Sequence, residues 1–285
     1  MRLSSDLLGV TVGPIQHDVD IDWITAFASG IGESETIPDV VAHPLFPVCY
    51  EWPALVAVGD QTVSEAIRPR GVHATHDMTI HRLPRPGDRL STTATTIGVE
   101  PRKPGTYVLT RLRTVDQAGA PVTTTDHGTL YLGVEFDSDL ARGSGSGGSG
   151  RSGARRVEAE PGTVWWQIQV EVASDLARIY SECSRIWNPI HTDRAAAVQA
   201  GLPDVILHGT ATLALAVSRI LTHEGESPER VRRIACRFGA MVFMPSTLIV
   251  RGARSGTHCY FHALTEESRP AVNQGLLAVV SERTS

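Results

Sequence analysis

The apolar positions before residue 188 recur at three- and four-residue steps, which places them on one face of a helix. They are Leu176, Ile179, Tyr180, Cys183 and Trp187. Pro189 predicts the end of this helix, because the residue before a proline is disfavoured in the α conformation. Residues 188–191 are then a tight loop. Thr192 or Asp193 can cap a short helix over 193–200, which Gly201 can close.

A second helix is predicted directly after His208-Gly209. Residues 210–222 are apolar on all sides, a pattern typical of a helix buried in a protein core. Gly225 is placed to end this helix. His191 differs from these core positions, because it lies on a loop between helices among polar neighbours, where a side chain is available for chemistry.

Strands fill much of the remaining chain. Alternating or Thr- and Ile-rich segments between turn residues predict them at 76–81, 89–99, 107–115, 121–134, 164–172, 230–238, 247–251, 258–264 and 272–280. Two shorter helices are predicted at 22–28 and 50–58, the second entered through Pro53 at its first turn. Each half of the chain therefore combines helices with a run of strands, which indicates an α+β protein.

A Gly- and Ser-rich segment divides the chain nearly in half. Its composition cannot bury apolar surface and predicts a flexible tether. We therefore expect a first domain over residues 1–136, a linker over 137–160 and a second domain over 161–285.

The composition narrows the class of protein. The 285 residues carry a net charge of −5, and the chain has no basic run that would indicate nucleic-acid binding. No apolar run is long enough to cross a membrane, and the N-terminus lacks the apolar core of a signal peptide. The four cysteines have no paired spacing, so we expect reduced thiols in a cytoplasmic protein.

Three short segments follow one another in the second half: Asn188-Pro-Ile-His191-Thr-Asp193, Ala200-Gly-Leu202 and Ile206-Leu-His-Gly209. In this order they resemble the hydratase motif of MaoC-like proteins, the R-specific enoyl-thioester hydratases and dehydratases of the hotdog fold. The resemblance implies a double hotdog, in which each half is an antiparallel sheet wrapped around a central helix.

The first half lacks this motif, and the resemblance implies that it holds the acyl chain. Phe46, Tyr50, Trp52 and Leu55 are candidates for that role, although buried aromatic residues are more often part of the core. The implied substrate is a 3-hydroxyacyl or enoyl thioester on CoA or on the phosphopantetheine arm of an acyl-carrier protein. We expect no other cofactor.

The resemblance also assigns roles to the motif. His191 is the expected acid/base, and the backbone amide of Gly209, at a helix N-terminus, is the expected donor to the developing oxyanion. Asn188 orients His191 or a water molecule, or else only makes an Asx-turn. The candidates for substrate binding are Tyr180, Ile186, Trp187 and His208, of which Tyr180 has the spacing of a core residue and His208 can fix the junction between loop and helix.

One position departs from the family. The family places a catalytic Asp two residues before the Asn of the motif, and this chain has Ile186 there. An isoleucine transfers no proton and makes a site drier, which can lower the pKa of a nearby histidine.

Metal binding, helix capping and phosphate binding are the other roles to consider for residues in and after the motif. His191, Asp193 and His208 lack the spacing of a zinc site, so we expect no metal. Asp193 is more often a charge at a helix N-terminus than a catalyst. A group of arginines in the second half can meet phosphates of CoA or can be solvated strand residues: Arg232, Arg233, Arg237, Arg251 and Arg254.

Three functions remain open. The first is hydration or dehydration of a 3-hydroxyacyl or enoyl thioester by His191, alone or with a carboxylate from elsewhere. The second is a one-base reaction on a thioester or polyketide-like substrate, such as isomerisation, cyclisation or elimination, which fits Ile186. The third is a non-catalytic acyl-thioester binder. A monomer and a homodimer are equally compatible with the sequence.

Overall fold

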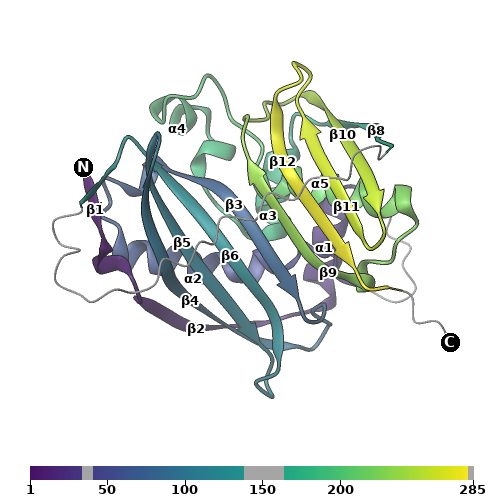
Figure 1. Ribbon diagram of the computed structural model, residues 1–285, viewed down its shortest axis with the longest axis horizontal. Coiled ribbons are helices and arrows are strands. Elements are labelled where there is room, and N and C mark those ends of the chain that lie inside the picture. The colour runs from purple at the N-terminus through teal and green to yellow at the C-terminus, as the bar shows by residue number, and fades with distance from the viewer. Residues whose placement is uncertain (34–40, 138–163, 282–285) are drawn as a thin grey trace.

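A computed structural model describes residues 1–33, 41–137 and 164–281. Ten strands form one antiparallel sheet in the order β2-β4-β5-β6-β3-β9-β12-β11-β10-β8 (Figure 1). The strands are β2 (Thr11–Asp18), β3 (Gly71–Ile80), β4 (Arg89–Arg102), β5 (Gly105–Val115), β6 (Pro121–Leu132), β8 (Trp166–Val172), β9 (Val231–Phe238), β10 (Ser246–Ser255), β11 (His258–Leu264) and β12 (Pro270–Val279). A separate parallel pair joins β1 (Arg2–Ser4) to β7 (Glu135–Asp137).

The sheet is made of two five-strand halves that meet at β3 and β9. Strands from the first half of the chain lie on one side of this seam and strands from the second half on the other (Figure 1). The pairing of β3 with β9 is antiparallel, with His76 opposite Cys236 and Met78 opposite Ile234. The predicted linker falls almost entirely outside the described residues, and the domain boundaries stay predictions.

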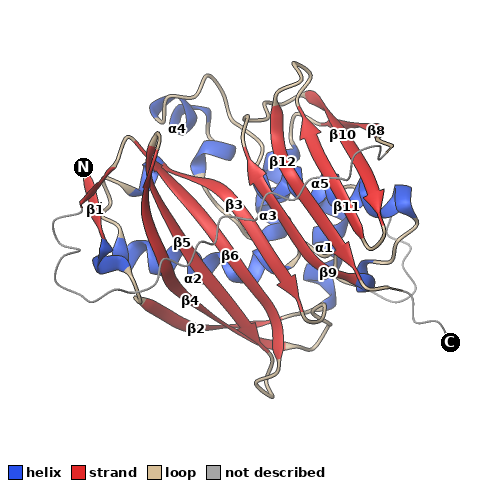
Figure 2. Ribbon diagram, viewed as in Figure 1, coloured by secondary structure: helices blue, strands red, loops and turns tan. Residues whose placement is uncertain are grey.

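The longer helices lie on one side of the sheet, behind it in Figure 2, whereas the short helix α4 lies above the upper ends of the strands in that view. The helices are α1 (Ile21–Gly30), α2 (Pro47–Thr62), α3 (Leu176–Ser184), α4 (Arg194–Gln199) and α5 (Gly209–Glu224). Helix α2 packs on β2, β4 and β5, whereas α5 packs on β10, β11 and β12, so each half has one long helix against its own strands. None of the helices in the described ranges is long and apolar enough to span a membrane.

Helix α5 has the environment that its sequence predicts. Ten of its sixteen residues are buried, and they cover every side of its central turns. Gly225 ends it with a φ of 64°, a left-handed conformation that favours glycine.

Helix α2 and strand β2 are among the elements that differ from the prediction. Helix α2 begins at Pro47 rather than near residue 50, and Pro53 lies inside it. A proline there removes one helical hydrogen bond, and the packing of the fully buried Phe46 and Tyr50 outweighs that loss. Strand β2 was not predicted, because as an edge strand it alternates only between exposed and half-buried residues.

The four first-half residues considered for acyl binding lie in or against the core. Phe46 and Tyr50 are fully buried, and Trp52 and Leu55 are half-buried against core clusters. Their packing role is therefore confirmed, and acyl binding by this half stays a prediction.

One carboxyl group is buried between α2 and β6. Glu51 is 2% exposed, and its Oε1 accepts hydrogen bonds from the hydroxyls of Thr125 at 2.8 Å and Thr123 at 2.9 Å. Burial raises the pKa of Glu51 to about 8, although the two threonine bonds lower it in part. Glu51 is therefore protonated in the folded protein at neutral pH.

This shift predicts a pH-dependent gain in stability for Glu51→Gln. The unfolded carboxyl loses its proton near pH 4.5 and the folded one near pH 8, so ionisation favours unfolding increasingly across that interval. Glutamine has a similar shape and stays neutral. We expect it to raise the free energy of unfolding by on the order of 3 kcal/mol at pH 7, and to have little effect at pH 4. Urea unfolding at both pH values measures the difference, and an equal effect at both would contradict the assignment.

Candidate active site

The helix before the motif ends earlier than its apolar spacing predicts. Helix α3 stops at Ser184, and Arg185 follows with a φ of 59°, in the left-handed region. The Ser184 hydroxyl donates to the Tyr180 carbonyl at 2.5 Å and accepts from the backbone amide of Ile186 at 3.3 Å. These local bonds reverse the chain before Pro189 can act, so the prediction that Trp187 shares the face of this helix was wrong.

The first half of the chain holds this reversal in place. The indole N–H of Trp23, on α1, donates to the Cys183 carbonyl at 3.0 Å, which satisfies one of the free carbonyls at the end of α3. The Arg185 guanidinium lies 3.9 Å from the centre of a Trp23 ring, in a cation–π arrangement. The position of the motif loop therefore depends on both halves.

The loop itself is a single 3-10 turn, over Pro189–His191, that begins at Asn188. The Asn188 Oδ1 atom accepts a hydrogen bond from the Ile190 amide at 3.4 Å. This is the Asx-turn that was one of the two expected roles for Asn188. The side chain presents His191 by shaping the loop.

His191 has a defined tautomer. Its Nδ1 lies 2.8 Å from the carbonyl oxygen of Ile206, and a carbonyl can only accept, so Nδ1 carries the hydrogen. The other nitrogen, Nε2, then has a free lone pair. Burial lowers the pKa of His191 to about 4, although the bond to Ile206 opposes this shift. At neutral pH, His191 is therefore an uncharged base.

His208 lies directly against this base. The two imidazole rings are stacked with their centres 3.6 Å apart. The Nε2 atom of His208 is 3.3 Å from the Ser181 hydroxyl, and burial, together with the charge that His191 would carry, lowers its pKa to about 2. The neutral ring of His208 therefore stacks on His191 and holds its orientation. His208 lies where we expected it, at the junction between the loop and α5.

Gly209 is the first residue of α5, where backbone amides have no partner within the helix. A side chain at this position would meet the ring of Phe238 at 3.1 Å, so the absence of a Cβ lets the backbone lie close to β9. The geometry permits the expected oxyanion role, in which the amide and the helix dipole face developing negative charge.

The other candidates for substrate binding lie in three different environments. Tyr180 is completely buried, with its ring 5.0 Å from that of His208 and 5.8 Å from that of Phe27. Ile186 is 5% exposed and belongs to the main core cluster, whereas Trp187 is 59% exposed. Packing explains Tyr180 and Ile186, and Trp187 alone of the three is open to a ligand.

The acidic residues around the motif have other partners. Glu182 pairs with Arg178 at 2.9 Å, and Asp204 lies 3.8 Å from Arg194. Asp193 caps α4 by accepting from the amides of Ala195 at 2.8 Å and Ala196 at 3.4 Å, which confirms its expected role at a helix N-terminus. Among the described residues, no carboxylate forms a hydrogen bond or an ion pair with His191.

Two of the five second-half arginines are engaged in ion pairs. Arg233 makes a two-pronged pair with Asp77 across the seam, at 2.8 and 2.7 Å, and Arg254 lies 2.6 Å from Glu226. These contacts favour structural roles for both residues over phosphate binding.

A histidine group that the sequence did not reveal lies across the seam from the motif. His73 and His76 on β3 and His127 on β6 are close together, and the His73 ring is 4.4 Å from that of Phe238. The pairing of β3 with β6 brings His127 to the other two histidines. The spacing of the three residues in the sequence does not predict that they meet.

The capping role of Asp193 can be separated from catalysis. Asp193→Ala removes the acceptor for two helical amides and is expected to lower the free energy of unfolding by about 1 kcal/mol. Asp193→Asn keeps an acceptor oxygen and is expected to stay within a few tenths of the native value. Denaturant unfolding of the three proteins measures both effects. Loss of turnover in Asp193→Asn with unchanged stability would instead make Asp193 part of the chemistry.

Comparison with known sequences finds similarity in the second half of the chain. Residues 156–272 match the model of the MaoC like domain. The fatty acid synthase beta subunit pkiC of Emericella nidulans is 34% identical over 113 residues, or 37% of this chain and 6% of that protein. The peroxisomal enoyl-CoA hydratase 2 of Arabidopsis thaliana is 33% identical over 95 residues, or 33% of this chain and 30% of that protein. The matches thus span less than a third of either relative.

Comparison with solved structures covers nearly the whole chain. A MaoC-like dehydratase from Phytophthora capsici superimposes with a TM-score of 0.80 at 22% identity, over 97% of both chains. A Mycobacterium tuberculosis protein described as a double hotdog superimposes with a TM-score of 0.61 at 14% identity, over 96% of both chains. The fold is therefore the expected double hotdog, and residues 156–272 are similar to the MaoC like domain.

Proposed function

We propose that this protein is a hydro-lyase that interconverts enoyl and 3-hydroxyacyl thioesters, with His191 as its acid/base. The observation that carries the proposal is the 2.8 Å bond from His191 Nδ1 to the Ile206 carbonyl, which leaves Nε2 unprotonated. A general base must hold a free lone pair at the working pH, and burial of this ring keeps the pKa near 4.

The α5 N-terminus supplies the second requirement of the reaction. As water adds to C3 of an enoyl thioester, the electrons of the double bond move toward the thioester oxygen, which gains negative charge. The amide of Gly209 and the dipole of the sixteen-residue helix are suited to stabilise that oxygen. The thioester carbonyl is therefore proposed to bind at Gly209.

His191 is proposed to move both protons. Its Nε2 takes a proton from the attacking water as the C3–O bond forms, and the resulting imidazolium returns that proton to C2 of the enolate. The net reaction adds one water molecule across the double bond, with the hydroxyl on C3 and the hydrogen on C2. These two proton transfers need no carboxylate. That agrees with Ile186 at the family's Asp position and with the ion pairs that Glu182 and Asp204 make elsewhere.

A one-base reaction is the second candidate, and the same Ile186 favours it. Isomerisation of a double bond, cyclisation, or elimination of a group that leaves without protonation requires only proton removal by His191. A non-catalytic binder is less favoured, because a binding site does not require a basic imidazole with a fixed tautomer.

The substrate class follows from the family and its relatives. The Arabidopsis relative is named for an enoyl-CoA substrate and another relative for fatty acid synthesis, so an acyl group on CoA or on a carrier protein is proposed. The first half is proposed to hold the acyl chain, beside the loop that Trp23 and Arg185 fix.

Hydration of a trans-2-enoyl-CoA tests the proposal directly. We expect the native protein to turn over this substrate, and His191→Ala to lose about 10²–10⁴-fold in kcat. Loss of absorbance of the conjugated thioester measures the rate. Asp193→Asn is the matched control, because it alters a neighbouring loop residue that we assign to a helix cap.

Ile186→Asp separates the two catalytic candidates. If the native protein hydrates the enoyl thioester, the first candidate holds. If only Ile186→Asp does so, the scaffold fits the thioester and the native reaction is a one-base reaction. If neither protein turns over, the substrate class or the catalytic assignment is wrong, and tight binding of the thioester by the native protein then favours the non-catalytic binder.

The pKa of His191 predicts an unusual pH profile. A free base is needed for hydration, so kcat/KM should stay level from pH 7 down to about pH 5 and fall to half near pH 4. Initial rates are measured where circular dichroism shows the protein folded. In Ile186→Asp, a nearby carboxylate favours the charged imidazole, so the fall should shift to higher pH. A native profile that falls near pH 6.5 would contradict a dry, neutral His191.

A further inference from the structure

The three histidines at the seam share one face of the sheet because β3 is irregular. Residues three apart in a regular strand point to opposite faces, so His73 and His76 would normally diverge. The register between β3 and β6 shifts between His73 and Thr75, which marks a bulge. An extra residue in one strand changes which face the following side chains meet. The rings of His73 and His76 are 5.5 Å apart as a result.

Strand pairing places the third histidine, His127, beside the other two. His127 on β6 lies directly opposite His76. Its ring is stacked on that of His73, with the centres 3.7 Å apart. One nitrogen from each of the three rings lies within 4.8 Å of the other two. Three imidazole nitrogens thus gather in one place from two strands.

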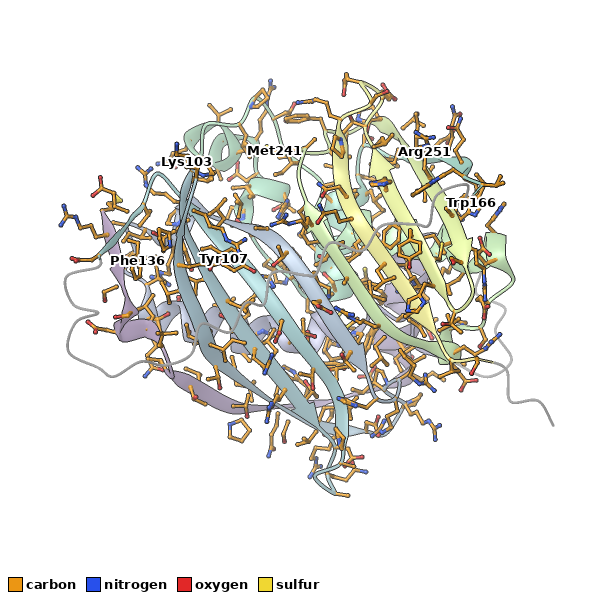
Figure 3. All side chains as sticks on the ribbon, viewed as in Figure 1. Lys103, Tyr107, Phe136, Trp166, Met241 and Arg251 are labelled. Carbon is orange, nitrogen blue, oxygen red and sulfur yellow. The ribbon has the colours of Figure 1, made fainter. Side chains whose placement is uncertain are left out.

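The backbone between these histidines is firmly held. The Thr75 hydroxyl bonds to the Tyr107 hydroxyl at 2.6 Å, which ties β3 to β5 (Tyr107 is labelled in Figure 3). A side chain at Gly128, next to His127, would clash with the hydroxyls of Tyr107 and Thr75, so the glycine makes room for this bond. The hydrogen-bond network therefore fixes the strands that carry the cluster.

His76 lacks the partners that a buried imidazole needs. It is 1% exposed, and neither of its ring nitrogens bonds to any group in the described part of the chain. A buried polar atom without a partner costs about 1–3 kcal/mol. Such an atom, facing two other imidazoles, indicates that a ligand completes the site.

We propose that His73, His76 and His127 bind one divalent transition-metal ion of the zinc class. Imidazole nitrogen is a preferred ligand for Zn²⁺, Ni²⁺ and Co²⁺. Three protein ligands leave a fourth position for water or for an oxygen of a bound molecule. This inference does not depend on the proposed hydratase activity.

The protonation of the cluster fits metal binding. His73 Nε2 is 3.1 Å from the Thr75 carbonyl, so Nε2 carries the hydrogen and Nδ1 holds the lone pair. A metal-bound histidine typically donates its other ring hydrogen to such an oxygen.

Binding requires a modest contraction. Two nitrogens on a tetrahedral zinc ion lie about 3.4 Å apart, given Zn–N distances of about 2.0–2.1 Å. The half-buried rings of His73 and His127 are the ones that must turn, and the turn opens their stack. Their partial exposure also gives an ion a path to the site.

The position of the cluster relates it to the motif. The His73 ring contacts that of Phe238, and Phe238 in turn packs where Gly209 begins α5. The proposed ion site and the proposed oxyanion donor therefore both lie next to the Phe238 ring. The ion site is separate from His191 and His208.

Titration with Co²⁺ tests the inference, because cobalt bound to imidazole has characteristic visible absorption. The full chain is prepared without a histidine tag, stripped with a chelator and titrated, and Zn²⁺ is then added in competition. We expect one Co²⁺ per chain and its displacement by Zn²⁺. No imidazole-bound cobalt in the native protein would overturn the proposal, whatever its hydratase activity.

Variants locate the ion. His76→Ala and His127→Ala should weaken binding by more than the 10–100-fold that loss of an outer partner of a ligand costs. His81→Ala is the matched control, because His81 follows β3 and bonds to Thr124 at 3.2 Å outside the cluster. Circular dichroism checks each fold, and His127→Ala serves if the fully buried His76 cannot be replaced. Loss of binding in His191→Ala but not in His127→Ala would assign the metal to the motif and overturn the proposal.

Discussion

The antiparallel pairing of β3 with β9 is the constraint on which the rest of the structure depends. It joins two five-strand halves into one sheet and fixes which inward side chains meet. Across this seam Arg233 pairs with Asp77, and Phe238 reaches both His73 and the start of α5. The motif and the histidine cluster are therefore neighbours because of strand register, although they are far apart in sequence.

Exclusion of water sets the chemistry that the interior can perform. Burial holds Glu51 protonated and His191 unprotonated at neutral pH, so both groups are neutral where their free counterparts are partly or fully charged. A neutral imidazole can accept a proton but has none on Nε2 to give. Any proton that His191 delivers must first be taken from the substrate or from water. In the proposed reaction, with Ile186 in place of a carboxylate, the Nε2 atom of His191 performs the base step and then the acid step.

The sequence predicts the parts of this molecule that depend on local pattern. The buried helix at 210–222, the cap at Asp193 and most strands follow from periodicity and turn residues, and the motif lies within the residues that match the MaoC like domain. Features set by neighbours were missed. The early end of α3 depends on Ser184 and on Trp23 from the other half. Edge strand β2 has no apolar alternation, and the histidine cluster exists only through a bulge and a cross-strand pair.

The two halves share a fold, yet only one can offer the expected oxyanion site, and the reason lies in a single residue. Helix α5 begins at Gly209, whose amide hydrogen is free at the helix N-terminus, whereas α2 begins at Pro47. Proline has no amide hydrogen, so the equivalent position of α2 has no donor. Upstream of Pro47, the His43 Nδ1 accepts from the Leu45 amide at 3.0 Å, so that ring has no free lone pair. The first half therefore offers neither this donor nor this base, and what it contributes to the motif loop is support, through the Trp23 contacts with Cys183 and Arg185.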